Sequence, residues 1–217
     1  MDAPTALERG RTAYREHRWS DAIAGFDAAD RASAATALDL AQLAIAATLV
    51  GRFEDCVDWL TRAHEAFLAD GDVDGAVRCA AWLGMQFMDV GDRAQAGGWF
   101  ARAQRLVDEH PDGRPDHGFL LIPEGLAALY RGDGAQAASV FGHAAELARA
   151  AKDPDLVALA ELGLGQSEIM LGRPAAGLAR LDEVMVAVTA GEVSPVPSGI
   201  VYCAVLQACR LARAELP

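Results

Sequence analysis

The stretch from Leu83 to Ala103, which decides the fold, reads LGMQFMDVGDRAQAGGWFARA. Its first part has the pattern L-G-x2-F, its last part has the pattern A-x3-F-x2-A, and the turn Gly91-Asp92 lies between them. Two close-packed antiparallel helices require small residues on one to face large residues on the other, because a ridge must enter a groove. The stretch therefore predicts a helical hairpin.

The same frame recurs along the chain. Four further copies are Gly10 with Ala22, Phe26 and Ala29; Leu43-Ala44 with Cys56, Leu60 and Ala63; Gly125 with Ala137, Phe141 and Ala144; and Leu164-Gly165 with Gly177, Leu181 and Val184. Measured at the small residue of each second helix (22, 56, 96, 137 and 177), the steps are 34, 40, 41 and 40 residues. The sequence therefore predicts five helical hairpins in tandem.

This pattern resembles the signature of the tetratricopeptide (TPR) family, in which L-G-x2-Y is followed by A-x3-F on the next helix. No copy matches every position: Arg9 and Glu124 replace the leucine, and Ala13, Ala47, Ala128 and Glu168 replace the aromatic residue. The resemblance covers nearly the whole chain. It implies an all-α fold, a right-handed superhelical solenoid of about five TPR-like helical hairpins plus a C-terminal helix.

We expect one solenoid domain over residues 1–217, because each repeat of a solenoid contacts only its neighbours. The predicted repeats span 3–35, 37–70, 76–110, 118–152 and 155–190, with a last helix at 199–214. A loop with two prolines is expected from Gly191 to Ser198. The last helix is apolar over its first two turns and has no predicted partner, so we expect a homodimer through this end.

The later, longer repeats resemble those of bacterial LuxR-type regulators, where such repeats lie between a nucleotide-binding module and a DNA-binding helix-turn-helix. The stretch MVAVTAGEVSP from Met185, followed by GIVYCAV from Gly199, is similar to the repeat region of actinobacterial LuxR-type regulators. This resemblance implies a regulatory role and assigns no chemistry to any residue.

Composition and charge exclude several classes of protein. With 19 basic and 31 acidic residues the formal net charge is −12, and no basic stripe is visible that could neutralise phosphates. We therefore expect no direct binding to nucleic acid. No apolar run is long enough for a membrane span, no leader is recognisable, and the four cysteines lack C-x2-C spacing. A cytoplasmic protein without a membrane contact is expected.

No reaction centre is recognisable. The sequence has no phosphate loop, no paired histidines at helical metal spacing and no nucleophile elbow, so we expect neither an enzyme nor a cofactor. Asp70 to Gly75 begins like a calcium loop, but Ala81 stands where the loop needs glutamate, and a capped turn is the better interpretation. The stretch His110 to His117 has two histidines and two aspartates among prolines, which favours a solvated connection over a metal site.

The inner face of the superhelix is the surface at which TPR proteins generally bind. Steps of three and four residues stay on one helix face, so this face lies at −6, −3, +1, +4 and +5 from the small residue of each first helix. Candidate binding residues on it are Ile45, Leu49, Arg78, Met85, Met88, Asp89, Phe119, Ile122, Leu126, Tyr130, Leu162, Gln166 and Ile169. Two explanations stay open: a groove for a partner, or an inner face that packs against itself as core.

We predict a non-catalytic TPR scaffold, a protein-interaction module of a bacterial transcriptional regulator, that holds a protein partner or an amphipathic helix in an apolar groove. Methionines would supply adaptable contacts, and Arg78, Asp89, Tyr130 and Gln166 would orient the guest. The alternative is a receptor for a small apolar effector, with a cavity between the third and fifth repeats. An enzyme ranks third.

Overall fold

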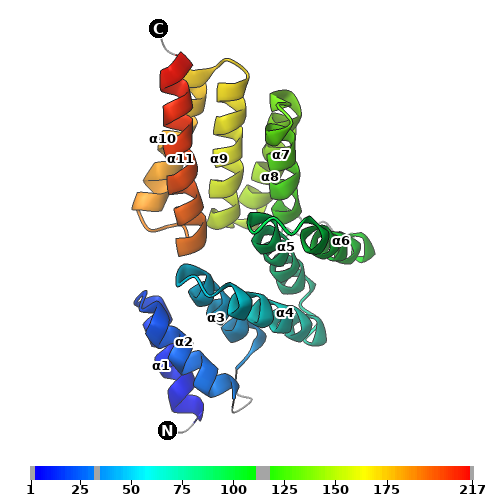
Figure 1. Ribbon diagram of the computed structural model, residues 1–217, viewed down its shortest axis with the longest axis vertical. Helices are drawn as coiled ribbons and strands as arrows, with labels where there is room; N and C mark the ends of the chain where they lie inside the picture. The colour runs from blue at the N-terminus through cyan, green and yellow to red at the C-terminus, as the bar shows by residue number, and fades with distance from the viewer. Residues whose placement is uncertain (1–2, 32–34, 111–117, 216–217) are drawn as a thin grey trace. The chain divides into compact units, whose positions relative to one another are not determined.

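The computed structural model describes residues 3–31, 35–110 and 118–215, which form helices and no strand. This part of the chain forms eleven helices. Most of them are paired as antiparallel neighbours (Figure 1). Their bounds are α1 Ala3–Arg15, α2 Trp19–Asp30, α3 Ala37–Leu49, α4 Phe53–Ala69, α5 Val73–Asp89, α6 Arg93–Glu109, α7 Gly118–Tyr130, α8 Gly134–Ala151, α9 Pro154–Met170, α10 Pro174–Thr189 and α11 Pro195–Glu215. The predicted all-α fold of paired helices is confirmed.

Three turns between helices, at Gly71-Asp72, Gly91-Asp92 and Gly132-Asp133, share one arrangement. A glycine with positive φ ends the helix, as at Gly91 with φ of 81°, because a residue without Cβ enters the left-handed region at little cost. An aspartate next to it accepts a hydrogen bond from the amide three residues on, as the Asp92 carboxylate does from the amide of Gln95 at 3.0 Å. Asp72 caps α5 in the same way, so the aspartate-rich stretch after α4 is the capped turn that the sequence predicted.

The small residues predicted to face large ones do so. At Gly84 of α5 an added Cβ would overlap the ring of Phe100 on α6. At Gly125 it would lie 2.6 Å from the ring of Phe141, and at Gly165 2.8 Å from Leu181. Each glycine therefore admits the large side chain of the helix that follows it.

The chain divides into two compact units, Met1–Asp112 and Gly113–Pro217. The boundary falls in the proline-rich stretch between α6 and α7, of which residues 111–117 lie outside the described part. Each unit has a core of its own. The prediction of one domain over the whole chain stays a prediction.

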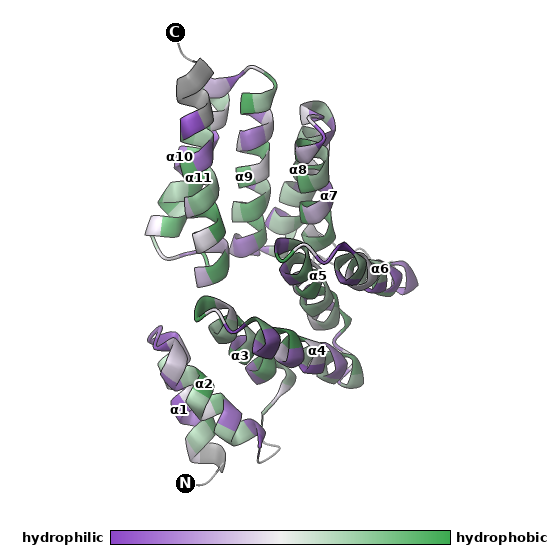
Figure 2. Cartoon of the chain, in the orientation of Figure 1, coloured by the Kyte–Doolittle hydropathy of each residue, from purple (hydrophilic) through white to green (hydrophobic). Residues whose placement is uncertain are grey.

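Unit 1 contains α1 to α6, packed in sequence order, each helix against the next. Its core includes Phe26, Leu43 and Leu83, all fully buried. Two two-pronged ion pairs add to this packing: Arg11 of α1 with Asp39 of α3, and Arg62 of α4 with Asp30 of α2. The helices differ in polarity, since α3 is mostly hydrophobic whereas α6 carries many hydrophilic residues (Figure 2).

Unit 2 contains α7 to α11. Besides the contacts between consecutive helices, α9 packs against both α7 and α11. Large side chains fill the space between these helices, among them Phe119, Phe141, Leu156, Leu181 and Val201. In the described part of the chain, no buried side-chain nitrogen or oxygen lacks a hydrogen-bond partner.

Two predictions about the C-terminal end are wrong. The loop expected from Gly191 to Ser198 is shorter, because α11 begins at Pro195, where the missing amide hydrogen of a proline in the first turn costs no helical bond. The last helix also has partners. It packs on α9 and α10, where Val201 and Ala208 are buried and Ile200 and Val205 pack against the same cluster.

Candidate partner-binding surface

Two helices of unit 1 leave one stripe of side chains unburied. The stripes share the spacing i, i+4, i+7 and i+11, which keeps their members on one helix face, and corresponding members are 40 residues apart. We call them together the unit-1 face: Leu38, Gln42, Ile45 and Leu49 of α3, with Arg78, Trp82, Met85 and Asp89 of α5. The opposite faces of both helices are buried in the core.

A side-chain hydrogen bond connects the two stripes near their C-terminal ends. The amide nitrogen Nε2 of Gln86 donates to Oγ1 of Thr48 at 3.4 Å. Thr48 in turn donates to the carbonyl of Ala44 at 3.1 Å and lies 3.1 Å from the sulfur of Cys56 on α4. These contacts place the end of the α3 stripe beside the end of the α5 stripe, within one unit.

The unit-1 face is apolar over most of its length. Leu38 is 59% exposed, while Ile45, Leu49, Trp82 and Met85 are half-buried. Exposed apolar surface of this kind marks interaction sites on many proteins. The polar members are Gln42, Arg78, which already has an interaction within the protein, and Asp89.

Asp89 is the exposed last residue of α5. The groups around its carboxyl remove part of its water, and this desolvation raises its pKa above the usual range. No other influence on the pKa is resolved among the described residues, so nothing offsets the desolvation.

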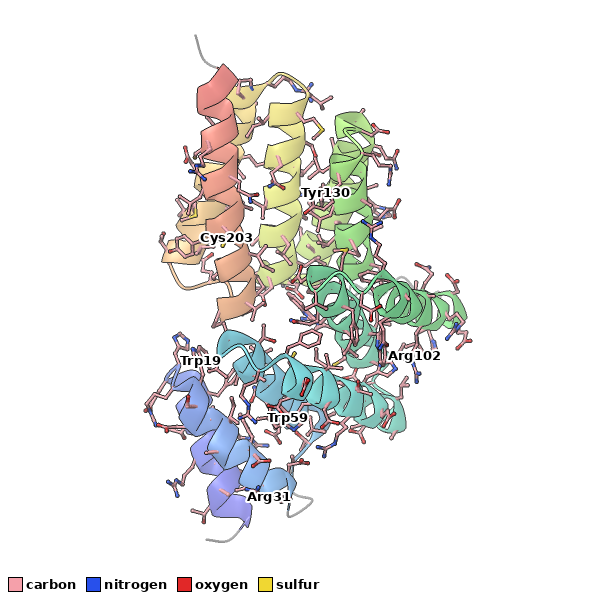
Figure 3. The ribbon with its side chains drawn as sticks, in the orientation of Figure 1. Trp19, Arg31, Trp59, Arg102, Tyr130 and Cys203 are labelled. Atoms are coloured by element: carbon pink, nitrogen blue, oxygen red, sulfur yellow. The ribbon has the colours of Figure 1, made fainter. Side chains whose placement is uncertain are left out.

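The predicted binding residues are divided between the two units. Ile45, Leu49, Arg78, Met85 and Asp89 lie on the unit-1 face, and Met88 packs partly against the unit-1 core. The other seven belong to unit 2. That unit buries Phe119, Ile122, Leu162 and Ile169, leaves Leu126 and Gln166 half-buried, and exposes 84% of Tyr130 at the end of α7 (Figure 3).

These four buried residues are part of the unit-2 core. This matches the alternative interpretation, in which the inner face packs against itself. In unit 1 the inner face is still accessible, so a partner site there stays a prediction.

Sequence reasoning missed two members of the unit-1 face. The frame used for the prediction placed Ala41 and Ala81 on the face, but Ala81 is buried, and Gln42 and Trp82 take these positions. Counting four residues on from Leu38 and from Arg78, instead of three, would have found both.

Unit 2 has an open pocket of about 720 Å³ between α8, α9 and α10. At its floor the carboxylate of Glu161 accepts hydrogen bonds from both Arg149 and Arg180. Val157 and Val184 form an apolar part of the pocket wall. The cavity predicted between the third and fifth repeats would involve both units and stays a prediction.

Neither a metal site nor a membrane-spanning helix is found in the described residues. No three histidine, cysteine, aspartate or glutamate side chains gather there as metal ligands would. The stretch from His110 to His117, weighed above as a connection or a metal site, lies mostly outside the described residues. Only His110 is described, and its Nδ1 lies 2.9 Å from the carbonyl oxygen of Leu106. No described helix is both long and apolar enough to cross a bilayer.

Comparison with known proteins identifies the fold. No protein-family model and no curated protein matches the sequence. Among solved structures, NprR in complex with its cognate peptide NprX is similar over 97% of this chain and 60% of its own, with a TM-score of 0.68 and 13% identity. The fold is that of TPR-like helical repeat proteins.

Two further structures have similar TPR-like repeats. The Rap conjugation gene regulator of the plasmid pLS20, in complex with the Phr* peptide, is similar over 86% of this chain and 53% of its own, with a TM-score of 0.68 and 16% identity. A thermophilic TPR protein of Thermus thermophilus is similar over 95% of this chain and 100% of its own, with a TM-score of 0.59 and 16% identity. The TPR-like chain thus spans between half and three fifths of NprR and Rap.

Proposed function

We propose that this protein is a non-catalytic TPR scaffold that binds a peptide segment of a partner protein on the unit-1 face. The observation that carries the proposal is the pair of stripes on α3 and α5, which stay apolar and accessible. At the corresponding repeat positions of unit 2, most predicted binding residues are buried in the core. An apolar stripe with few polar groups suits an amphipathic segment, and Met85 can adapt to the shape of its guest.

Two similar structures support binding of a peptide, since NprR and the Rap regulator were both solved with peptides. The Rap protein is described as a conjugation gene regulator, and this supports the further proposal that the scaffold serves a cytoplasmic transcriptional regulator of the LuxR type. In this role the TPR repeats would receive a signal and would not contact DNA, consistent with the net charge of −12.

The test of this proposal is capture of partners from cell extract by wild-type and variant proteins. Ile45→Glu and Met85→Glu each place a charge on the unit-1 face and leave the buried residues of α3 and α5 unchanged. We expect both to lose the captured partner while keeping the helical circular dichroism spectrum. Val186→Glu, at a position 67% exposed on α10, is the matched control and should keep the partner.

If every partner stays bound to Ile45→Glu and Met85→Glu with the fold intact, the unit-1 face is not the binding site. Loss of the partner only in Val186→Glu would move the site to unit 2.

A small-molecule receptor is the second candidate function. The open pocket of about 720 Å³ in unit 2 favours it, since this volume suits a metabolite-sized ligand and its wall combines apolar residues with arginines. A ligand that raises the thermal midpoint of the wild type but not of Val184→Arg would support this function. Midpoints that stay constant across a metabolite panel would count against it.

A further inference from the structure

Asp89 departs from the pattern of its repeat position. The corresponding residue at the end of the first helix is Arg15 in α1, Leu49 in α3, Tyr130 in α7 and Met170 in α9, and none of these is acidic. Asp89 also ends α5, and the C-terminal end of a helix carries a partial negative charge that repels a carboxylate. The end of the helix is thus electrostatically unfavourable for an aspartate.

The protein itself does not compensate for this charge. Among the described residues, the Asp89 carboxylate has neither an ion-pair partner nor a hydrogen-bond donor, and desolvation is the one influence on its pKa. By contrast, Asp39 and Asp30 of the same unit, which are more deeply buried, are each held by an arginine with two hydrogen bonds. A carboxylate that costs stability and receives no partner within the fold is a candidate for a functional role.

The surroundings of Asp89 indicate what would pair with it. It ends the α5 stripe one turn after Met85, and the connection between Gln86 and Thr48 brings the apolar end of the α3 stripe alongside. An occupant of this place must therefore offer apolar side chains and a positive charge. A lone carboxylate is too few ligands for a calcium ion, and an acidic segment would be repelled both by Asp89 and by the net charge of −12.

We infer that the unit-1 face takes an amphipathic peptide segment with a lysine or arginine side chain that pairs with the carboxylate of Asp89. This inference rests on the proposed function and adds the sign of charge of the partner. The pair would form beside apolar side chains that exclude water, so it is worth more than an ion pair in open solvent. Binding should weaken at high salt, because part of its free energy is electrostatic.

The experiment measures binding of two synthetic peptides by isothermal titration calorimetry at low and high salt. Both peptides are amphipathic helices with the same leucine positions, and the polar positions are lysine in one and glutamate in the other. The wild type should bind the lysine peptide and not the glutamate peptide. Asp89→Asn should weaken binding of the lysine peptide about three- to tenfold at low salt.

Asp70→Asn is the matched control, because it makes the same change in net charge at an exposed residue that follows α4, outside the unit-1 face. It should leave the affinity unchanged. Asp89→Lys should reverse the preference and bind the glutamate peptide.

Equal affinities of Asp89→Asn and Asp70→Asn for the lysine peptide would overturn the inference, as would failure of the wild type to bind the lysine peptide. If Met85→Glu abolishes binding while Asp89→Asn does not, the unit-1 face stays the site and only the predicted charge pair fails. If neither change affects binding, the proposed site fails as well.

Discussion

At the scale of single residues, the hydrogen bonds of His64 determine its protonation state and its tautomer. It is fully buried, its Nδ1 lies 2.8 Å from the carbonyl oxygen of Ala76, and the Nε–H of Arg102 donates to its Nε2 at 2.8 Å. A carbonyl oxygen only accepts and a guanidinium only donates, so the imidazole is neutral with its proton on Nδ1. Trp99 lies edge-on to the imidazole, with ring centroids 5.5 Å apart.

This arrangement makes unit 1 sensitive to acid. Burial, followed by the positive charge of Arg102, lowers the pKa of His64, although the carbonyl of Ala76 and the nearby Glu65 act in the opposite direction. A group with a lowered pKa in the folded state binds its proton more tightly when unfolded, so this stability is present at neutral pH and is lost as the pH falls below about 6.5. We expect the free energy of unfolding in urea to fall between pH 7.5 and pH 5.5.

The control for this prediction is His64→Gln, whose side-chain amide can donate to Ala76 and accept from Arg102 without titrating. The wild type should lose about 1 kcal/mol more than this variant between the two pH values. An identical pH dependence of both proteins would show that His64 is not the responsible group.

At the scale of elements, the second helices of unit 1 are connected at one repeated position. Arg62 of α4 donates to Asp30 of α2, and Arg102 of α6 donates to His64 of α4 (Figure 3 labels Arg102). Each arginine lies six residues after the small residue of its helix, and each acceptor lies eight after that of the preceding one. A hydrophobic pattern alone does not reveal this register, because arginine occurs at many exposed positions.

The glycines that face large side chains provide a second prediction at this scale. Gly84→Ala would gain about 1 kcal/mol in helix propensity, but its Cβ would overlap the ring of Phe100 and force the two helices apart. We expect a net loss of about 1 to 3 kcal/mol in the free energy of unfolding by urea. Gly97→Ala in α6 has no atom within 4 Å of the new Cβ and should instead stabilise the protein by about 0.5 to 1 kcal/mol. Stabilisation by both substitutions would show that the helices of this hairpin are less closely packed.

At the scale of the whole molecule, α11 bears on association. Its packing on α9 and α10 removes part of the apolar surface that suggested a dimer, but Tyr202 is still 48% and Leu206 67% exposed.

We expect a homodimer through this exposed part of α11, because apolar side chains of this size gain free energy when a partner covers them. Light scattering at micromolar concentration should give twice the mass of the chain for the wild type and the monomer mass for Leu206→Lys. Val90→Lys, on unit 1 at a position 57% exposed, is the control and should stay dimeric. A wild-type monomer would contradict the prediction.

The sequence by itself determined the hairpins of this protein. Small residues such as Gly84 and Gly125, facing Phe100 and Phe141 at a fixed spacing, specify pairs of neighbouring helices. In three of the turns a glycine followed by an aspartate also specifies where one helix ends and the next begins. Such signals lie within a few dozen residues, so they can be recognised in one chain. The start of α11 differs from the prediction, because Pro195 and Pro197 are typical of a loop, although the first turn of a helix also accepts proline.

Only the tertiary structure decided which inner-face residues are accessible. Met85 and Leu126 are half-buried at the same repeat position, whereas Arg78 and Phe119 share another position and differ in burial. The sequence pattern assigns the two residues of each pair to the same helix face. It does not predict how close the first helix of the next repeat lies to that face. In unit 2, α9 packs directly against both α7 and α11 and this face is filled with core, whereas in unit 1 the stripes of α3 and α5 stay uncovered. The distance between neighbouring helices depends on side chains from several repeats at once, so it is set only when the whole unit has packed.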